Sequence, residues 1–263
     1  MKRAAVFLFV AFAGVFTAGA DLTARQMKGA EHVAPVSIPT PAEFFAAIDK
    51  AGKPDWASLY REPGPTSYPT RTQTALNLGA LVTDGYMAVE AQDGQQVKNT
   101  GKEIIALAKA LGVGEDVLVR GKSIGDFADK NDWFALREEL DATTNEVRRA
   151  MAGQRDAALA SLITAGAWLR AIQVGSRAAL LNGEEQSLML LRQPALIAML
   201  REDLRQLPDK ARGGPVITRT DMTLTAVEDM MTPPDGEPFG TERVVSIRDT
   251  TSQLVSDMSS NKP

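Results

Sequence analysis

The stretch AALASLITAGAWL, residues 157–169, decides the fold of this chain. It carries no charged residue, and small side chains are frequent in it. A helix that is apolar on every side is buried on every side, so we interpret this stretch as the central helix of a helical bundle. The alternative is a membrane-spanning helix. However, Arg155, Asp156 and Arg170 leave the uncharged run well short of the ~20 residues that cross a bilayer.

The segments around this stretch repeat apolar residues every three or four positions, which is the spacing of an amphipathic helix. One of them runs from Trp133 to Met151 with charged residues on its other face, and Asn131 or Asp132 is its expected N-cap. The only short β-like run, residues 216–218, stands alone and has no strand to pair with. The sequence therefore predicts an all-α protein, a multi-helix bundle or short helical array of about eight or nine helices.

Residues 1–20 have the layout of a secretory signal peptide. Lys2 and Arg3 precede an uncharged apolar run, and Ala18-Gly19-Ala20 supplies a small-residue cleavage site. We expect cleavage after Ala20 and a periplasmic or secreted mature protein. Loss of the two basic leader residues changes the formal net charge from −4 to −6.

The mature chain divides into three parts by composition. Residues 21–69 form a lead-in with one helix, whose start is marked by Thr40 as N-cap and Pro41 at the first helical position. Residues 70–212 form the main helical domain. Residues 213–263 supply C-terminal helices packed on that domain, after a hinge at residues 213–215 and with Asp221 and Thr241 as expected N-caps.

Composition excludes several classes of activity. A negative net charge argues against nucleic acid as a partner. We also expect no transmembrane segment in the mature chain, because the sequence has no second uninterrupted apolar stretch of about 20 residues. The chain has no cysteine and one histidine, His32. Disulfides, thiolate metal sites, histidine-ligated metal centres and Ser-His-Asp chemistry are therefore not expected. We predict neither a metal nor another cofactor.

A short pattern occurs twice. Residues 81–85 read LVTDG and residues 162–166 read LITAG, each in an apolar, alanine-rich helix. The repeat is consistent with a duplicated helical unit or with two independent core helices of similar composition. In both cases Gly85 and Gly166 are expected at tight helix crossings, because glycine inside a helix costs about 1 kcal/mol relative to alanine.

Most acidic residues are expected on the surface. Glu138, Glu139 and Asp141 lie on the polar side of an amphipathic helix. Three further acids precede that helix: Asp126, Asp129 and Asp132. Paired carboxylates can hydrolyse glycosides, but acids in such positions are usually solvated.

Charged and polar residues inside apolar helices form the candidate ligand-binding site: Asp84, Tyr86, Glu90 and Arg170. Arg170 interrupts the most apolar helix, so its guanidinium needs a partner or a water-filled cleft. Asp84 and Glu90 are the expected partners. Asn77 lies seven residues before Asp84 and therefore on the same helix face.

These observations favour an exported, non-enzymatic binding or assembly protein whose partner is an unknown protein or a small polar ligand. The alternative is a carboxylate-dependent enzyme acting on cell-wall glycan or polysaccharide. Two inward-facing acids in one deep pocket would favour the enzyme, whereas a broad apolar groove would favour partner binding.

Overall fold

The structure, a computed structural model, describes residues 40–153 and 156–260. The expected signal peptide and His32 lie outside these residues. The described residues form one compact unit, and every described helix belongs to it.

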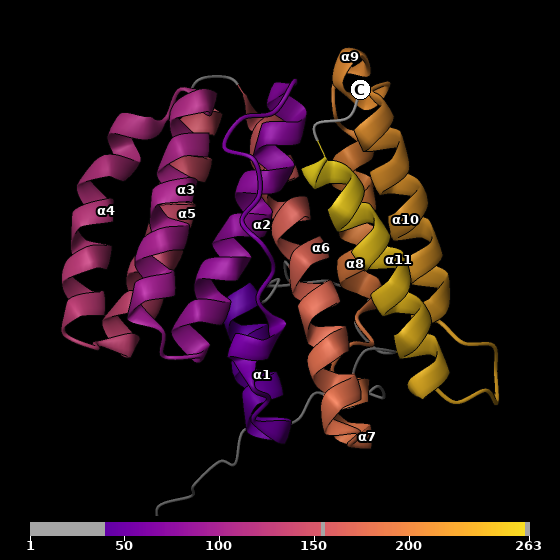
Figure 1. Ribbon diagram of the computed structural model, residues 1–263. Helices are drawn as coiled ribbons and strands as arrows, with labels where there is room; N and C mark the ends of the chain where they lie inside the picture. Colours follow the sequence, from indigo (N-terminus) through magenta and orange to yellow (C-terminus); the bar gives the residue numbers. More distant parts are fainter. Residues whose placement is uncertain (1–39, 154–155, 261–263) are drawn as a thin grey trace, which may run out of the picture. The chain divides into compact units, whose positions relative to one another are not determined.

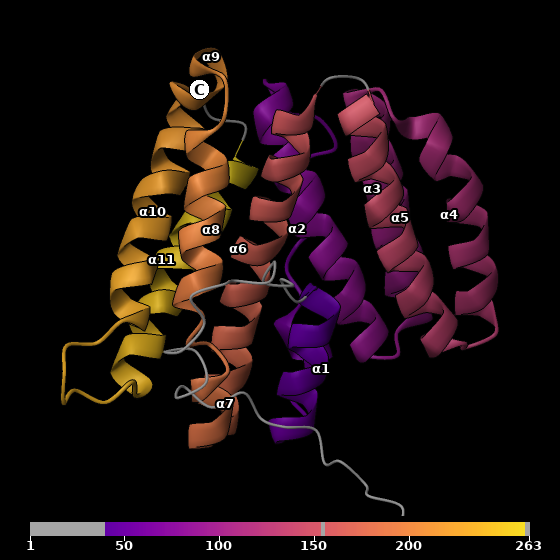
Figure 2. The ribbon, with the colours of Figure 1, turned by 180° about the vertical axis from the view of Figure 1, so that it is seen from behind.

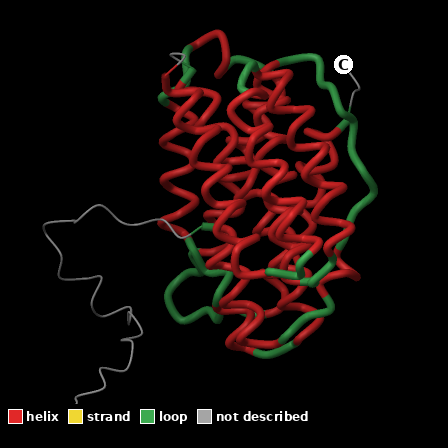
Figure 3. Tube along the Cα trace, turned by 90° about the vertical axis from the view of Figure 1, so that its left-hand side faces the viewer, coloured by secondary structure: helices red, strands yellow, loops and turns green. Residues whose placement is uncertain are grey.

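The described residues are all-α, as the sequence predicts: 79% of them are helical, and none is in a strand. Figure 3 shows the helices joined by loops. Nine α-helices in this part of the chain have seven or more residues. They are α1 (Pro41–Gly52), α2 (Arg71–Glu90), α3 (Gly94–Leu111), α4 (Gly114–Asp129), α5 (Trp133–Gly153), α6 (Ala157–Asn182), α8 (Pro194–Arg205), α10 (Pro215–Met231) and α11 (Thr241–Ser259). The short elements are a 3-10 turn η2 (Trp56–Leu59), α7 (Glu185–Met189) and α9 (Asp209–Arg212).

The helices α2 and α6 form the centre of the unit and share its most extensive contact. Helices α3, α4 and α5 lie on the α2 side, and α8, α10 and α11 lie on the α6 side (Figure 1). Viewed from behind, α1 lies in front of the lower part of the central pair (Figure 2), and it packs on both α6 and α2. The other long helices are thus arranged around the two apolar ones.

Helix α6 is the buried core helix that its composition predicts. Leu162, Ile163 and Trp168 are at most 2% exposed. By length and composition α6 could also cross a membrane, the only such helix among the described residues, and 67% of its most apolar window is buried inside the fold. That degree of burial is the expected result for a core helix.

The α2–α6 crossing depends on two glycines, and one of them differs from the prediction. A Cβ added to Gly166 would lie 1.9 Å from the backbone oxygen of Leu76, so the predicted close crossing is confirmed there. The prediction for Gly85 is wrong, since its added Cβ would meet nothing closer than 3.7 Å. Gly79 takes that place, with an added Cβ 1.9 Å from the oxygen of Ile163.

The two copies of the short pattern are not used alike. The Thr83 hydroxyl donates across the crossing to the carbonyl oxygen of Ala167 at 2.8 Å. The equivalent Thr164 donates within its own helix to Ala160. A duplicated unit therefore stays a hypothesis.

Several predicted helix starts are confirmed. Thr40 and Glu43 form a reciprocal capping box at α1, which satisfies two backbone amides that the first turn leaves free. Asp132, rather than Asn131, accepts from the backbone amide of Ala135 at the start of α5.

The C-terminal region is more helical than predicted. The β-like run at residues 216–218 belongs to α10, which begins at Pro215 with Gly214 as its N-cap. The predicted hinge is therefore a helix start, and Asp221 is not a cap. Helix α11 has Gly240 as its N-cap, with Thr241 already inside the helix. Proline at the first helical position explains why β-branched residues continue as a helix here.

Candidate functional site

The predicted partner of Arg170 is confirmed as Asp84. The guanidinium Nε of Arg170 on α6 donates to Oδ1 of Asp84 on α2 at 2.7 Å. Arg170 is 1% exposed and Asp84 is 7% exposed. Burial lowers the pKa of the Arg170 guanidinium, and the Asp84 carboxylate opposes that change. A guanidinium keeps its charge even at this depth, so its burial is stabilised only when an opposite charge faces it.

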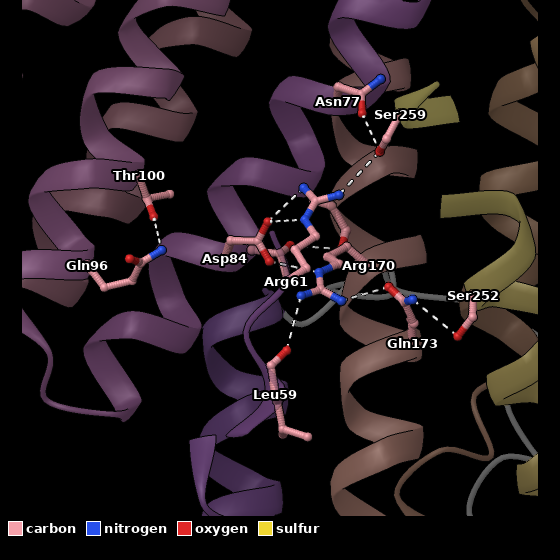
Figure 4. Close-up of polar contacts among 12 residues, drawn as sticks. Leu59, Arg61, Asn77, Asp84, Gln96, Thr100, Arg170, Gln173, Ser252 and Ser259 are labelled. Carbon is pink, nitrogen blue, oxygen red and sulfur yellow. Dashed lines mark hydrogen bonds and ion pairs between the residues drawn. The ribbon is translucent and has the colours of Figure 1, made fainter. Parts of the chain in front are cut away.

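A second arginine holds the other oxygen of the same carboxylate. Arg61 donates from Nε to Oδ2 of Asp84 at 2.8 Å and from Nη2 at 2.7 Å. Arg61 belongs to the irregular segment between η2 and α2. Proline and glycine residues in this segment keep the chain from forming a helix there. The sequence does not single out Arg61, because a charge beside a proline-rich loop carries no helical pattern. Figure 4 shows the two guanidiniums one above the other beside the carboxylate, each facing one of its oxygens.

Both arginines make further hydrogen bonds. Arg170 donates to Oε1 of Gln173 at 2.7 Å and to the carbonyl oxygen of Leu59 at 3.4 Å. Arg61 donates from Nη1 to Oγ of Ser259 at 3.3 Å. Gln173 in turn donates to Ser252 on α11 at 3.1 Å. The network therefore joins η2, α2, α6 and α11 through one carboxylate.

The same network holds the end of α11. Asn77 donates to the carbonyl oxygen of Met258 at 2.6 Å, and Ser259 donates to Oδ1 of Asn77 at 3.0 Å. Side chains from α2 thus satisfy groups that a helix end leaves unpaired. Ser259 connects Asn77 to Arg61 and so to Asp84, as expected for two residues on one face of α2.

A small polar pocket opens beside Asp84. It offers about 20 Å³ to a water-sized molecule, where roughly 10–15 Å³ suffices for one water. Its polar lining comes from the segment after η2, from α2 and from α3. The lining residues are Tyr60, Arg61, Glu62, Pro63, Gly64, Leu81, Asp84, Met87, Gln96, Thr100 and Glu103.

Glu103 on α3 is the second acid in this pocket. Its carboxylate makes no hydrogen bond or ion pair with the residues that the structure describes. Desolvation raises the pKa of Glu103, the negative charge of Asp84 raises it further, and Arg61 opposes both. Glu103 is therefore an acid that is partly removed from water without a direct counter-charge in the described part of the chain. The sequence does not single it out, because α3 has an ordinary amphipathic pattern.

Tyr60, at the start of the irregular segment, also has an unsatisfied group. Its hydroxyl oxygen is buried and lies near the Asp93 carboxylate, but it has no partner within normal hydrogen-bond geometry among the described residues. Burial raises the pKa of the Tyr60 hydroxyl, and the nearby negative charge of Asp93 raises it further. Tyr60 therefore remains a neutral hydroxyl at the edge of the pocket.

Tyr86 and Glu90 do not join this site. The Tyr86 hydroxyl donates to Asp141 on α5, and both oxygens of Glu90 accept from Arg137 at 2.7 and 2.8 Å. Each residue turns a helix by about 100°, so Tyr86 lies on the opposite side of α2 from Asp84. The four predicted site residues thus lie in three separate contacts, and only Asp84 and Arg170 meet.

The acids of α4 and α5 are mostly at the surface, as expected. Glu138, Asp126, Asp129 and Asp132 are not buried. Glu139 is half-buried and pairs with Arg120 at 3.3 Å. No group of three or more His, Cys, Asp or Glu residues that could hold a metal ion occurs among the described residues.

A larger hollow of about 350 Å³ lies between α3 and α4. Its lining includes Gly101 and Gly125, and a Cβ added to either would have no heavy atom within 4 Å. Lys98 and Lys102 also line it, and Lys98 pairs with Asp129 at 2.6 Å. Close packing against the described residues therefore does not require glycine at either of these two positions.

Comparisons of the chain with protein-family models, with curated proteins and with solved structures find no match.

Proposed function

We propose that the mature chain is an exported, non-enzymatic binding protein, and that the pocket beside Asp84 is its ligand site. The observation that carries this proposal is the combination of a polar pocket with an acid, Glu103, that has no partner among the described residues. Polar groups that are removed from water usually have a hydrogen-bond partner. A carboxylate that is partly desolvated beside a cavity and has no protein partner is a feature that a bound molecule would explain.

The architecture around the pocket suits binding rather than turnover. Asp84 is held by two guanidiniums, and each of its oxygens accepts from one of them. A carboxylate used in this way is fixed in place and cannot act as a general base without giving up its partners. It instead positions the segment that bears Arg61, which forms one wall of the pocket.

One observation favours the alternative, an enzyme acting on glycan. Asp84 and Glu103 line the same pocket, and glycosidases use two carboxylates on either side of the scissile bond. The space of about 20 Å³ weighs against it, because that space admits about one water-sized group and cannot enclose a sugar ring. Asp84 is also occupied by both arginines, so it is unavailable to a substrate.

The proposal is tested with the mature chain, residues 21–263, in two parallel assays. In the first, ¹⁵N-labelled protein is titrated with small polar probes of each charge class, and saturable shifts are expected at residues 60–64 and 96–103. In the second, release of soluble sugar from peptidoglycan and polysaccharides is measured, and no turnover is expected. Turnover that disappears in Asp84→Asn would establish the enzyme instead, and an absence of saturable shifts with every probe would refute binding at this pocket.

A further inference from the structure

We infer that the pocket beside Asp84 binds a primary ammonium group. This inference rests on the proposed function, because it names the chemistry of the ligand for the same site. It starts from the donors and acceptors that the fold leaves unused there.

The arginines are poorly placed to bind an anion. Arg61 and Arg170 direct their guanidinium groups to Asp84, Ser259, Gln173 and the carbonyl oxygen of Leu59. A carboxylate or phosphate entering the pocket would have to compete with these acceptors. It would also lie beside the carboxylate of Glu103, which repels it.

The available groups on α3 are acceptors, and the Tyr60 hydroxyl in the same lining can accept as well as donate. Glu103 has two carboxylate oxygens that accept no hydrogen bond from the described residues, and the amide oxygen of Gln96 and the hydroxyl of Thr100 belong to the same lining. The amide nitrogen of Gln96 reaches Thr100 at only 3.4 Å (Figure 4), so this contact is weak. An ammonium group carries three N–H donors and no acceptor, and it therefore matches a lining of acceptors.

Charge and size agree with this choice. The charged side chains that line the pocket are Arg61 and three acids, Asp84, Glu103 and Glu62, and Arg170 pairs with Asp84 from behind the lining. The sum of these formal charges is −1, and one added positive charge brings it to zero. The space for about one water accepts an ammonium group, whereas a quaternary ammonium group is larger and has no N–H donor.

The test is a titration of ¹⁵N-labelled mature chain, residues 21–263, with n-propylammonium chloride at constant ionic strength. Saturable shifts are expected at residues 60–64 and 96–103. In Glu103→Gln the dissociation constant should rise at least about tenfold, since a charge-assisted hydrogen bond is lost. Glu138→Gln makes the same change in net charge on the polar side of α5 and should leave the dissociation constant unchanged. Tetramethylammonium should produce no saturable shift.

Two sources of the ammonium group are separated by one further probe, Nα-acetyl-lysine-N-methylamide. Tighter binding of this capped lysine than of propylammonium indicates a lysine side chain of a polypeptide, and equal or weaker binding indicates a free small amine. Either result supports the inference.

Other results overturn the inference and separate it from the proposed function. Acetamide and sodium acetate are titrated in the same way. If acetamide or acetate gives saturable shifts at the pocket while propylammonium does not, the pocket binds ligands but the ammonium inference is wrong. If no probe binds, the pocket holds water alone and both proposals fail. An unchanged dissociation constant in Glu103→Gln also overturns the inference, provided that the variant keeps the wild-type amide spectrum away from the pocket.

Discussion

The two sides of the buried ion pair should not be equivalent when they are removed. Arg170→Met takes away a buried charge and one of the two partners of Asp84, but Arg61 remains at 2.7 Å. The loss is therefore about one charge-assisted hydrogen bond, partly offset by the burial cost of the guanidinium that is no longer incurred. We expect the free energy of unfolding to fall by about 2 kcal/mol.

Asp84→Asn should be more damaging, because among the described residues this carboxylate is the only counter-charge in direct contact with the two arginines. Arg170 is 1% exposed and would keep its charge without an anion beside it. Removing one partner of a buried pair typically costs about 3–5 kcal/mol. We expect a loss in that range, larger than the loss for Arg170→Met.

The assay is urea unfolding of the mature chain, followed by circular dichroism, for the wild type, both single variants and the double variant. In the Asp84→Asn background, Arg170→Met should cost about 1 kcal/mol or less, since the charged pairing is already lost. Equal m-values would show that the variants unfold from similarly compact states. The reasoning is refuted if Arg170→Met costs more than Asp84→Asn, or if the two changes are additive.

Four other predictions concern separate parts of the chain. Gly166→Ala should lower the free energy of unfolding in urea by roughly 3 kcal/mol or more, because the new Cβ would lie 1.9 Å from a backbone oxygen of α2. Gly85→Ala should be neutral or stabilising by up to about 1 kcal/mol, because its new Cβ would lie 3.7 Å from the nearest atom. Equal effects of the two substitutions would contradict the described crossing. Leu162→Ala should cost about 2–5 kcal/mol, and a cost near zero would place α6 at the surface. The pKa of Glu103 is raised above its ordinary value of 4.5 in the folded state, so the folded form binds the proton more tightly than the unfolded form. The wild type therefore loses this contribution to stability as the pH rises above 4.5, and Glu103→Gln should gain stability relative to the wild type between acidic and neutral pH. A difference in unfolding free energy that does not change with pH would argue against the desolvated acid. N-terminal sequencing of protein from its native cell should begin just after Ala20, and an intact Met1 would contradict export.

The core helix and its buried charge can be predicted because both produce local signals. An uncharged apolar run of residues 157–169 has only one stable environment in a helical fold, the interior. Arg170 directly after it then requires an anion, and Asp84 is one of two acids inside the other apolar helix. The sequence names both candidates, and the fold selects between them by the face of α2 that meets α6.

The rest of the site depends on contacts that leave no pattern in the sequence. Arg61 reaches Asp84 from an irregular segment, and no periodicity marks a side chain that a loop delivers into the core. Glu103 has the spacing of an ordinary surface residue on α3, and only the packing of α2 and the irregular segment against it removes it from water. The choice of Gly79 over Gly85 at the crossing likewise depends on the rotation of α2, which composition does not set.

The prediction that this helix starts at Asp221 rather than at Pro215 is wrong for a similar reason. Taken in isolation residues 216–218 have high strand propensity, but Pro215 before them is favourable at the first position of a helix. The apolar side chains of this helix face, Ile217, Leu224 and Met231, are at most 1% exposed. Burial of this face against α8 and α11 outweighs the local preference of β-branched residues.

The most direct test of the central claim is a crystal structure of the mature chain, residues 21–263, at a resolution that shows ordered water. We expect Arg61 and Arg170 to hold the two oxygens of Asp84, Glu103 to face the pocket, and an ordered water or cation to lie within hydrogen-bonding distance of the Glu103 carboxylate. An Arg61 side chain directed into bulk solvent, or a pocket closed by direct pairing of Arg61 with Glu103, would contradict the proposed site.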